Sequence, residues 1–276
     1  MRLLILGLGY TAQAVAALVP EWRVLGTTRD GRGGTLRFDD RDAVAREIAL
    51  ASHVLSSVPP ADDADPALAA YGSALARSGA WLGYLSSTGV YGDADGAWVD
   101  ETSPTGGGRR DTRARADADW LALGARVFRL PGIYGFGRSP IDRVREGKAH
   151  RTCIAGQVFS RCHVEDIARG VIAGFDAPAR AYNLADDRPC SQDQVVTFAA
   201  ALLGLPPPPV VALETLSRQA RGFYAENRRV ANGKAKRVLG WRPLYPDYRA
   251  GLRALSAMTS PIPVSTAPAT ASGDQR

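Results

Sequence analysis

Short continuous apolar runs alternate with stretches of helical periodicity over the first half of the chain. The runs predict buried strands at Leu3–Leu6, Arg23–Thr27, Thr35–Phe38, His53–Val58, Trp81–Leu85 and Arg126–Leu130. Between them, apolar residues recur at helical spacing over Thr11–Val19, Asp42–Leu50, Pro66–Ser78 and Asp111–Leu123. Strands that alternate with helices are typical of βαβ units, so we predict an α/β fold with a doubly wound, Rossmann-type parallel sheet.

The pattern changes after Pro131. Helices are expected at Pro140–Glu146, at Val164–Phe175 and from the N-cap Ser191 to Leu203, with extended or irregular chain over Cys153–His163 and a brief strand at Ala181–Leu184. Residues 256–276 are rich in small residues, Pro, Ser and Thr, which indicates a disordered tail. We predict a first domain over residues 1–134, with its sheet completed by residues 162–184. A smaller, mostly C-terminal domain is expected from residues 135–161 and 185–255.

Composition and charge limit the classes of partner. Of 276 residues, 45% are hydrophobic and 22% are charged, which is ordinary for a globular protein. The net charge of +6 comes from basic residues spread among Asp and Glu, so we expect small anionic molecules and no nucleic acid as partners. No stretch approaches the ~20 apolar residues of a membrane span, and glycines end the first apolar run after Leu6. We expect no membrane partner, no signal peptide and a cytoplasmic location.

The cysteines and histidines are few and show no metal-site spacing. The cysteines are Cys153, Cys162 and Cys190, an odd number without a redox or zinc pattern. We predict buried thiols in a reducing compartment and no metal.

A glycine-rich turn joins the first strand to the first helix. It reads Gly7-Leu8-Gly9-Tyr10-Thr11-Ala12, which is G-x-G-x-x-A. Gly7 allows the tight turn, Gly9 lets a pyrophosphate approach the backbone, and Ala12 lets the helix pack closely on the strand. The backbone of Tyr10 and Thr11 lies at the helix N-terminus, where N–H groups and partial positive charge favour phosphate. The first domain is therefore predicted to bind a dinucleotide.

The end of the second strand reads Thr27-Thr28-Arg29-Asp30 and indicates which dinucleotide. Sites for NAD usually place a carboxylate there, whereas Thr28 and Arg29 suit the 2′-phosphate of NADP, through charge-assisted hydrogen bonds. We favour NADP(H) over NAD(H), although a small shift would offer Asp30 to a 2′-hydroxyl instead. Asp39, after the third strand, is a candidate acceptor for the adenine amino group. Its alternative is a solvated loop aspartate.

Six stretches in order resemble the extended short-chain dehydrogenase/reductase superfamily, the NAD(P)-dependent epimerase/dehydratase group. They are the glycine turn, "LSSTGVYGD", "RLPGIYGFG", "HVEDIARGV", "YNLADD" and "NGKAKRVLGWRPLYPDYRAGL", and they extend to about residue 255. The resemblance implies a cofactor domain, a smaller substrate domain and a cleft for a small-molecule substrate between them. It places Val58 and Pro131 beside the cofactor and implies a homodimer through helices beside the fifth strand.

This superfamily normally uses Ser/Thr, Tyr and Lys, with the Tyr and Lys four apart on the helix after the fifth strand. Here no lysine follows any tyrosine by four residues. The spacing puts the tyrosine position near Asp111 and the lysine position near Arg115. Arg115 can hold a ribose hydroxyl as a donor but cannot act as a base, because its pKa stays above about 12. The proton relay is therefore missing or rebuilt.

A rebuilt relay would use the end of the fifth strand. The resemblance assigns Ser87 to the Ser/Thr position, with Thr88 and Tyr91 as further catalytic candidates, and Tyr134 and Arg161 as substrate-binding candidates. Asp166 is expected to cap its helix, and Gly222–Val230 is expected at the cleft. We predict an NADP(H)-dependent oxidoreductase or epimerase-like enzyme acting on a small carbonyl or sugar-like substrate. The alternative is a dinucleotide-binding sensor or interaction protein without catalysis.

Overall fold

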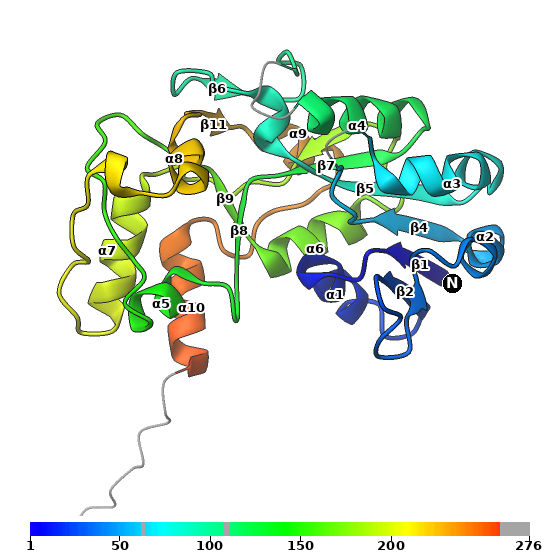
Figure 1. The fold of residues 1–276 in the computed structure, drawn as a ribbon, viewed down its shortest axis with the longest axis horizontal. Coiled ribbons are helices and arrows are strands. Elements are labelled where there is room, and N and C mark those ends of the chain that lie inside the picture. Colours follow the sequence, from blue (N-terminus) through cyan, green and yellow to red (C-terminus); the bar gives the residue numbers. More distant parts are fainter. Residues whose placement is uncertain (62–63, 107–110, 260–276) are drawn as a thin grey trace, which may run out of the picture.

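The computed structural model describes residues 1–61, 64–106 and 111–259 and contains a seven-stranded parallel sheet (Figure 1). Its strands are β1 (Arg2–Leu6), β2 (Arg23–Thr28), β3 (Leu36–Arg37), β4 (His53–Ser56), β5 (Trp81–Ser87), β7 (Arg126–Leu130) and β10 (Ala181–Asn183). Their order is β10-β7-β5-β4-β1-β2-β3, and every neighbouring pair is parallel. The chain crosses over after β3 and returns to pair β4 with β1. This is the predicted doubly wound α/β fold.

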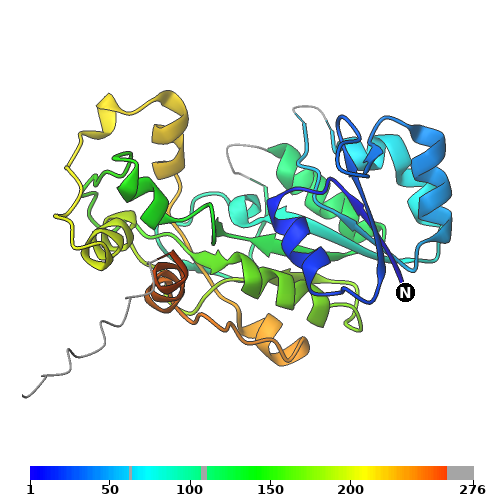
Figure 2. The ribbon, with the colours of Figure 1, turned by 90° about the horizontal axis from the view of Figure 1, so that it is seen from below.

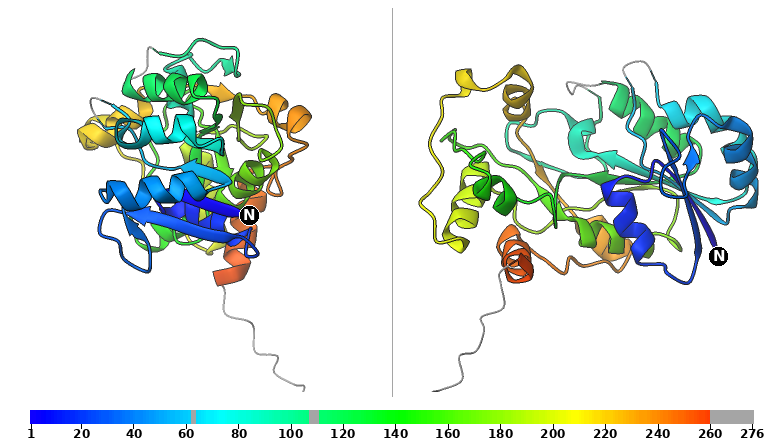
Figure 3. Two further views of the ribbon diagram at one scale, coloured as in Figure 1. Left: turned by 90° about the vertical axis from the view of Figure 1, so that its right-hand side faces the viewer. Right: turned by 60° about the horizontal axis from the view of Figure 1, so that its bottom comes forward.

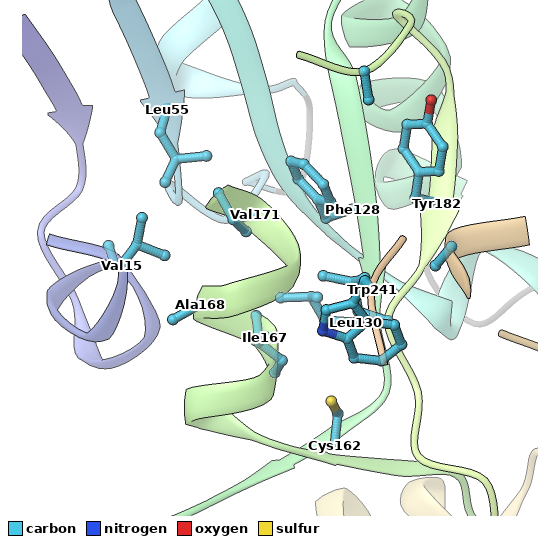
Figure 4. Close-up of a cluster of buried hydrophobic side chains, with 14 of the residues drawn as sticks. Val15, Leu55, Phe128, Leu130, Cys162, Ile167, Ala168, Val171, Tyr182 and Trp241 are labelled. Carbon is cyan, nitrogen blue, oxygen red and sulfur yellow. The ribbon is translucent and has the colours of Figure 1, made fainter. Parts of the chain in front are cut away.

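Helices cover both faces of the sheet (Figure 1). One face carries α1 (Tyr10–Ala17) and α6 (Val164–Ala173), and the other carries α2 (Arg41–Leu50), α3 (Pro66–Arg77) and α4 (Asp111–Ala122). Figure 4 shows the core around α6, where Val15, Phe128 and Trp241 meet Ile167 and Val171. Burying both faces explains why the strands read as continuous apolar runs.

A second lobe lies beyond the carboxyl ends of the strands (Figures 2 and 3). It contains α5 (Pro140–Arg145), α7 (Gln192–Leu202), η2 (Leu213–Thr215), α8 (Arg218–Tyr224) and α10 (Tyr248–Thr259). Its core includes Ile141, Val195 and Leu252. Two short parallel ladders link the lobe to the sheet: β8 (Gly132–Tyr134) with β9 (Arg161–His163), and β6 (Trp98–Val99) with β11 (Arg229–Val230). The remaining elements are η1 (Thr88–Tyr91) and α9 (Gly233–Val238).

Several local expectations needed correction. Helix α10 continues to Thr259, past the residue at which the tail was expected, because Tyr248, Leu252 and Leu255 share one buried face. Residues 260–276 lie outside the described residues. Cys162 and Cys190 are buried, but Cys153 is exposed.

Asp166 does not cap α6. His163 is the N-cap, and its Nδ1 accepts from the backbone N–H of Glu165 at 3.3 Å. The Asp166 carboxylate instead accepts from the backbone N–H groups of Leu244 (2.6 Å) and Tyr245 (3.0 Å). It therefore anchors the segment that leads into α10. The predicted N-cap Ser191 is confirmed by a capping box with Gln194.

A buried ion pair joins α4 to the sheet. The Arg129 guanidinium donates to Asp117 through Nε (3.1 Å) and Nη2 (2.7 Å), and the two side chains are 5% and 2% exposed. Ser86 Oγ donates to the same carboxylate at 2.7 Å, and Arg129 Nη1 donates to the Tyr91 hydroxyl at 3.0 Å. Tyr91 in turn donates to Asn183 Oδ1 at 2.8 Å. The network connects α4, β5, β7, β10 and η1.

Among the described residues, no helix is long and apolar enough to cross a membrane.

Replacing Asp117→Asn is expected to lower the free energy of unfolding by about 3–5 kcal/mol, because the buried Arg129 charge loses its counter-ion. Urea unfolding followed by circular dichroism measures the loss. The control is Asp39→Asn, which breaks an equally well-formed but exposed pair with Arg37. Equal losses for the two variants would show that burial of the Asp117 pair does not matter.

Candidate functional site

A cavity of about 710 Å³ lies where the sheet meets the second lobe. Its sheet-side wall includes Ser87, Thr88 and Pro131, and its lobe-side wall includes Arg161 and Phe223. The carboxyl ends of β5 and β7 thus open onto the cavity. Ligands of open α/β sheets bind in this place.

The glycine turn has the geometry of a phosphate cradle. Gly7 has φ +83°, which an L side chain rarely adopts, and a Cβ there would come within 3.0 Å of Val58 Cγ2. A Cβ on Gly9 would meet no atom within 4 Å, so the backbone at Gly9 is open to a ligand. Gly9 is the N-cap of α1 and supplies no side-chain cap, which leaves first-turn N–H groups available. These residues fit a bound dinucleotide pyrophosphate.

Thr28 and Arg29, the two residues at the end of β2 that are candidates for binding the 2′-phosphate, differ in how available their side chains are. The Thr28 hydroxyl is committed to the turn, since it donates to Asp30 at 3.1 Å and accepts from the backbone N–H of Gly31 at 3.0 Å. Arg29 is exposed, and no hydrogen bond or ion pair holds it among the described residues. It is thus available to a ligand, whereas Thr28 is largely used.

Asp39 is exposed and is already paired. Its two carboxylate oxygens accept from Arg37 Nε (2.9 Å) and Nη2 (2.7 Å). The adenine contact expected for Asp39 would have to compete with, or share, this pair.

Ser87 is oriented as a donor. Its Oγ accepts from the backbone N–H of Gly89 at 3.1 Å and caps η1, so its own hydroxyl proton has no acceptor among the described residues. Thr88 also lines the cavity.

Tyr91 does not line the cavity. Its hydroxyl lies in the buried network between Arg129 and Asn183, and the Arg129 guanidinium carbon is 5.0 Å from its ring centroid. Burial raises the pKa of Tyr91 to about 12, although Arg129 opposes the shift. The placement argues against Tyr91 as a proton carrier and makes it a structural residue.

On α4, Arg113 reaches the cavity and Arg115 does not. Arg113 is half-buried and lines the cavity together with Ser87, and its Cδ is 4.0 Å from where a Cβ on Gly89 would lie. Arg115, to which the spacing assigned the lysine position, is exposed and absent from the described cavity wall. The α4 arginine that faces the cavity is therefore Arg113, two residues before the position that the spacing indicated.

The buried ion pair explains this rotation of α4. Asp117 follows Arg113 by four residues and lies on the same face of the helix. Because Asp117 is held by Arg129, that face turns toward β5 and β7. Asp111, near which the spacing put the tyrosine position, is exposed and is not among the residues that line the cavity.

Tyr134 and Arg161 both line the cavity, but only part of each is available. The Tyr134 hydroxyl is buried without a partner among the described residues, and it packs against Gly251 of α10. Burial raises the pKa of Tyr134 above its usual value. Its ring can contact a substrate, whereas its hydroxyl cannot exchange protons with one.

The sequence did not single out Arg113 or Arg138, and it indicated Phe223 only through the segment Gly222–Val230. Arg138 lines the cavity, with its guanidinium carbon 5.8 Å from the ring centroid of Tyr10. Tyr10 donates to the carbonyl of Phe136 at 3.0 Å. Residues 135–138 therefore lie against the beginning of α1. The sequence did not predict this contact, because Tyr10 and Phe136 are 126 residues apart.

Asp186 lies behind the cavity wall. Its backbone N–H donates to the Arg161 carbonyl at 2.7 Å, and its Oδ2 is buried without a partner among the described residues. Burial raises the pKa of this carboxyl to about 8. In the part of the chain that the structure describes, no three His, Cys, Asp or Glu side chains gather as a metal site would require.

No protein-family model matches the chain. Two curated relatives are similar to it. One is the 3-diazoavenalumate denitrifying reductase of a Streptomyces species, 28% identical over 173 residues, which are 56% of this chain and 55% of the relative. The other is protein YeeZ of Escherichia coli K12, 30% identical over 182 residues, which are 63% of this chain and 62% of the relative. The matched part is little more than half the length of each relative.

Among solved structures, a functionally unknown conserved protein from Silicibacter pomeroyi is 41% identical, with a TM-score of 0.86 over 93% of this chain and 98% of that one. The two chains belong to one family. MoeE5 in complex with UDP-glucuronic acid and NAD shares the fold at 20% identity and a TM-score of 0.74, over 94% of this chain and 99% of that one. The human epimerase family protein SDR39U1 with NADPH also shares the fold. It is 17% identical, with a TM-score of 0.72 over 93% of this chain and 99% of that one.

Replacing Asp186→Asn should change how stability depends on pH. The raised pKa means that the folded state holds a proton that the unfolded chain releases near pH 4, so wild-type stability falls as the pH rises from about 4 to 8. The variant does not release this proton. Its free energy of unfolding, relative to that of the wild type, should therefore rise by more than ~1 kcal/mol between pH 5 and pH 8. Denaturant unfolding across this range measures it. Parallel curves for the two proteins would contradict the assignment.

Proposed function

We propose that the chain is a member of the extended short-chain dehydrogenase/reductase superfamily, and that it is an NADP(H)-dependent oxidoreductase or epimerase-like enzyme acting on a small carbonyl or sugar-like substrate. One observation carries the proposal. The open phosphate cradle at Gly9 and the cavity beside Ser87 lie at the same end of one parallel sheet. A dinucleotide extended across the strand ends would bring its two halves to these two places.

Different residues at this edge of the sheet would bind different parts of the cofactor. The Gly7–Thr11 turn would hold the pyrophosphate, Arg29 the 2′-phosphate, and Val58 and Pro131 would flank the cofactor. When bound, NADPH supplies a hydride. Arg138, which packs on Tyr10, adds positive charge at the cavity end of the cradle.

Ser87 and Arg113 would act on the substrate. Ser87 would donate its hydroxyl proton toward the substrate oxygen, because its Oγ accepts from the Gly89 N–H and its proton has no acceptor among the described residues. Arg113 places a permanent positive charge beside the oxygen, where negative charge develops during reduction. A guanidinium does not release a proton at neutral pH, so the oxygen receives its proton from Ser87, which is reprotonated by water. The site thus stabilises an anion without the usual phenol.

The assay is oxidation of NADPH against a panel of carbonyl compounds and nucleotide sugars. Turnover of any member supports an enzyme. Tight NADPH binding without turnover would instead support the second function, a dinucleotide-binding sensor, which the missing Tyr-x-x-x-Lys pair favours. A cytoplasmic location and a homodimer remain predictions.

Arg29→Ala is expected to lower affinity for NADPH at least ~10-fold while changing affinity for NADH little, because only NADPH carries the phosphate. Calorimetric titration measures both affinities. Arg77→Ala removes an exposed arginine from the end of α3 and should alter neither. Equal losses for the two cofactors would remove the 2′-phosphate role from Arg29.

Arg113→Ala should reduce kcat at least ~10-fold, because the charge that stabilises the developing anion is lost. The matched control is Arg115→Ala, which removes an exposed arginine one half-turn away on the same helix. Steady-state kinetics on whichever substrate the panel identifies compares the two. A larger effect at residue 115 would restore the assignment made from sequence spacing.

A further inference from the structure

Arg161 is a buried cation whose protein partners are all neutral. It is 7% exposed, and its Nη1 donates to the carbonyls of Phe159 (2.9 Å) and Cys190 (3.1 Å) and to the Cys190 thiol (3.2 Å). Its Nη2 donates to the Gln192 side-chain oxygen at 2.9 Å. Its Nε–H has no acceptor among the described residues. The hydrogen bonds fix the guanidinium in place and leave its charge uncompensated.

An uncompensated buried charge is costly, so it marks a position where an anion is expected. No carboxylate among the described residues lies within ion-pair distance of Arg161. Asp186 lies nearby but forms no ion pair with Arg161, and burial raises the pKa of its carboxyl, which disfavours the charged form. The contrast within the same cavity is Arg228, which pairs with Glu226 at 2.8 Å.

An aromatic wall adjoins this cation. Phe159 and Phe223 are stacked, with ring centroids 4.5 Å apart and planes 15° from parallel. Both line the cavity, and Phe223 is 48% exposed although one of its faces is covered by Phe159. The Arg161 guanidinium carbon is 5.9 Å from the Phe159 centroid. The same cavity therefore presents an exposed aromatic ring, Phe223, and a fixed positive charge, Arg161.

We propose that the cavity takes a planar acid, a carboxylate carried on an aromatic or conjugated group. Arg161 holds the carboxylate, and the Phe159–Phe223 pair stacks against the planar part. A carboxylate fits better than a phosphate because three of the four guanidinium N–H groups on Nη1 and Nη2 already have protein acceptors, which leaves one edge for a single charge. This assignment names a substrate class for the proposed reductase and rests on that function only for the reaction, not for binding.

The test uses calorimetry on the full chain with and without saturating NADP⁺. The probes are trans-cinnamate, its uncharged amide cinnamamide, and phenyl phosphate. The acid should bind at least ~10-fold more tightly than the amide, and more tightly than the phosphate, since a charge-assisted hydrogen bond is lost in the amide. This comparison is made within the wild-type protein and does not depend on whether any variant folds.

Arg161→Gln should abolish the preference for acid over amide, and Arg161→Lys should restore part of it. Arg169→Gln, on the exposed face of α6, is the control and should keep the full preference. Equal affinity for acid and amide, binding of neither, or tighter binding of the phosphate would each overturn the proposal. Failure to bind NADP⁺ alongside a retained acid preference would refute the proposed reductase and leave the acid site standing.

Discussion

The ion pair between Asp117 and Arg129 determines how the cavity is built. A carboxylate and a guanidinium that are almost fully buried can remain charged only if they face one another, so α4 has one stable rotation against β5 and β7. That rotation turns Arg113, one turn earlier on the helix, into the cavity beside Ser87. The same guanidinium holds the Tyr91 hydroxyl away from the cavity. One interaction therefore supplies the site with a cation and removes a phenol from it.

The resulting site differs in chemistry from a Tyr-Lys relay. It contains a hydroxyl donor at Ser87 and guanidinium groups at Arg113, Arg138 and Arg161, while the nearby phenols of Tyr91 and Tyr134 are buried in the protein. Such a site can orient and stabilise an anion more readily than it can transfer a proton. An anionic substrate and a permanent cation near the developing charge are two consequences of this same arrangement.

The sequence predicted the strands, the helices of the first domain and the glycine turn, because each depends on residues close together in the chain. It did not predict which α4 arginine faces the cavity, since the ion pair that decides this links residues 12 apart on different elements. Tyr91 was a catalytic candidate from its place after the fifth strand, and the sequence could not show that its hydroxyl is bonded to Asn183, 92 residues away. The sequence also could not show that Arg161 lacks a carboxylate partner, because its hydrogen-bond partners Cys190 and Gln192 lie about 30 residues away in the second lobe. Side-chain direction at the cavity is thus set by long-range contacts.

The most direct test of this account is hydrogen–deuterium exchange of the protein with and without saturating NADPH. A single extended ligand should slow exchange together in peptides covering residues 5–13, 84–92 and 129–138, which form the cradle and the cavity wall. Exchange in the α7 helix, away from the cofactor, should not change. Protection confined to the cradle, or no protection at all, would contradict the claim that one nicotinamide dinucleotide reaches from Gly9 to Ser87.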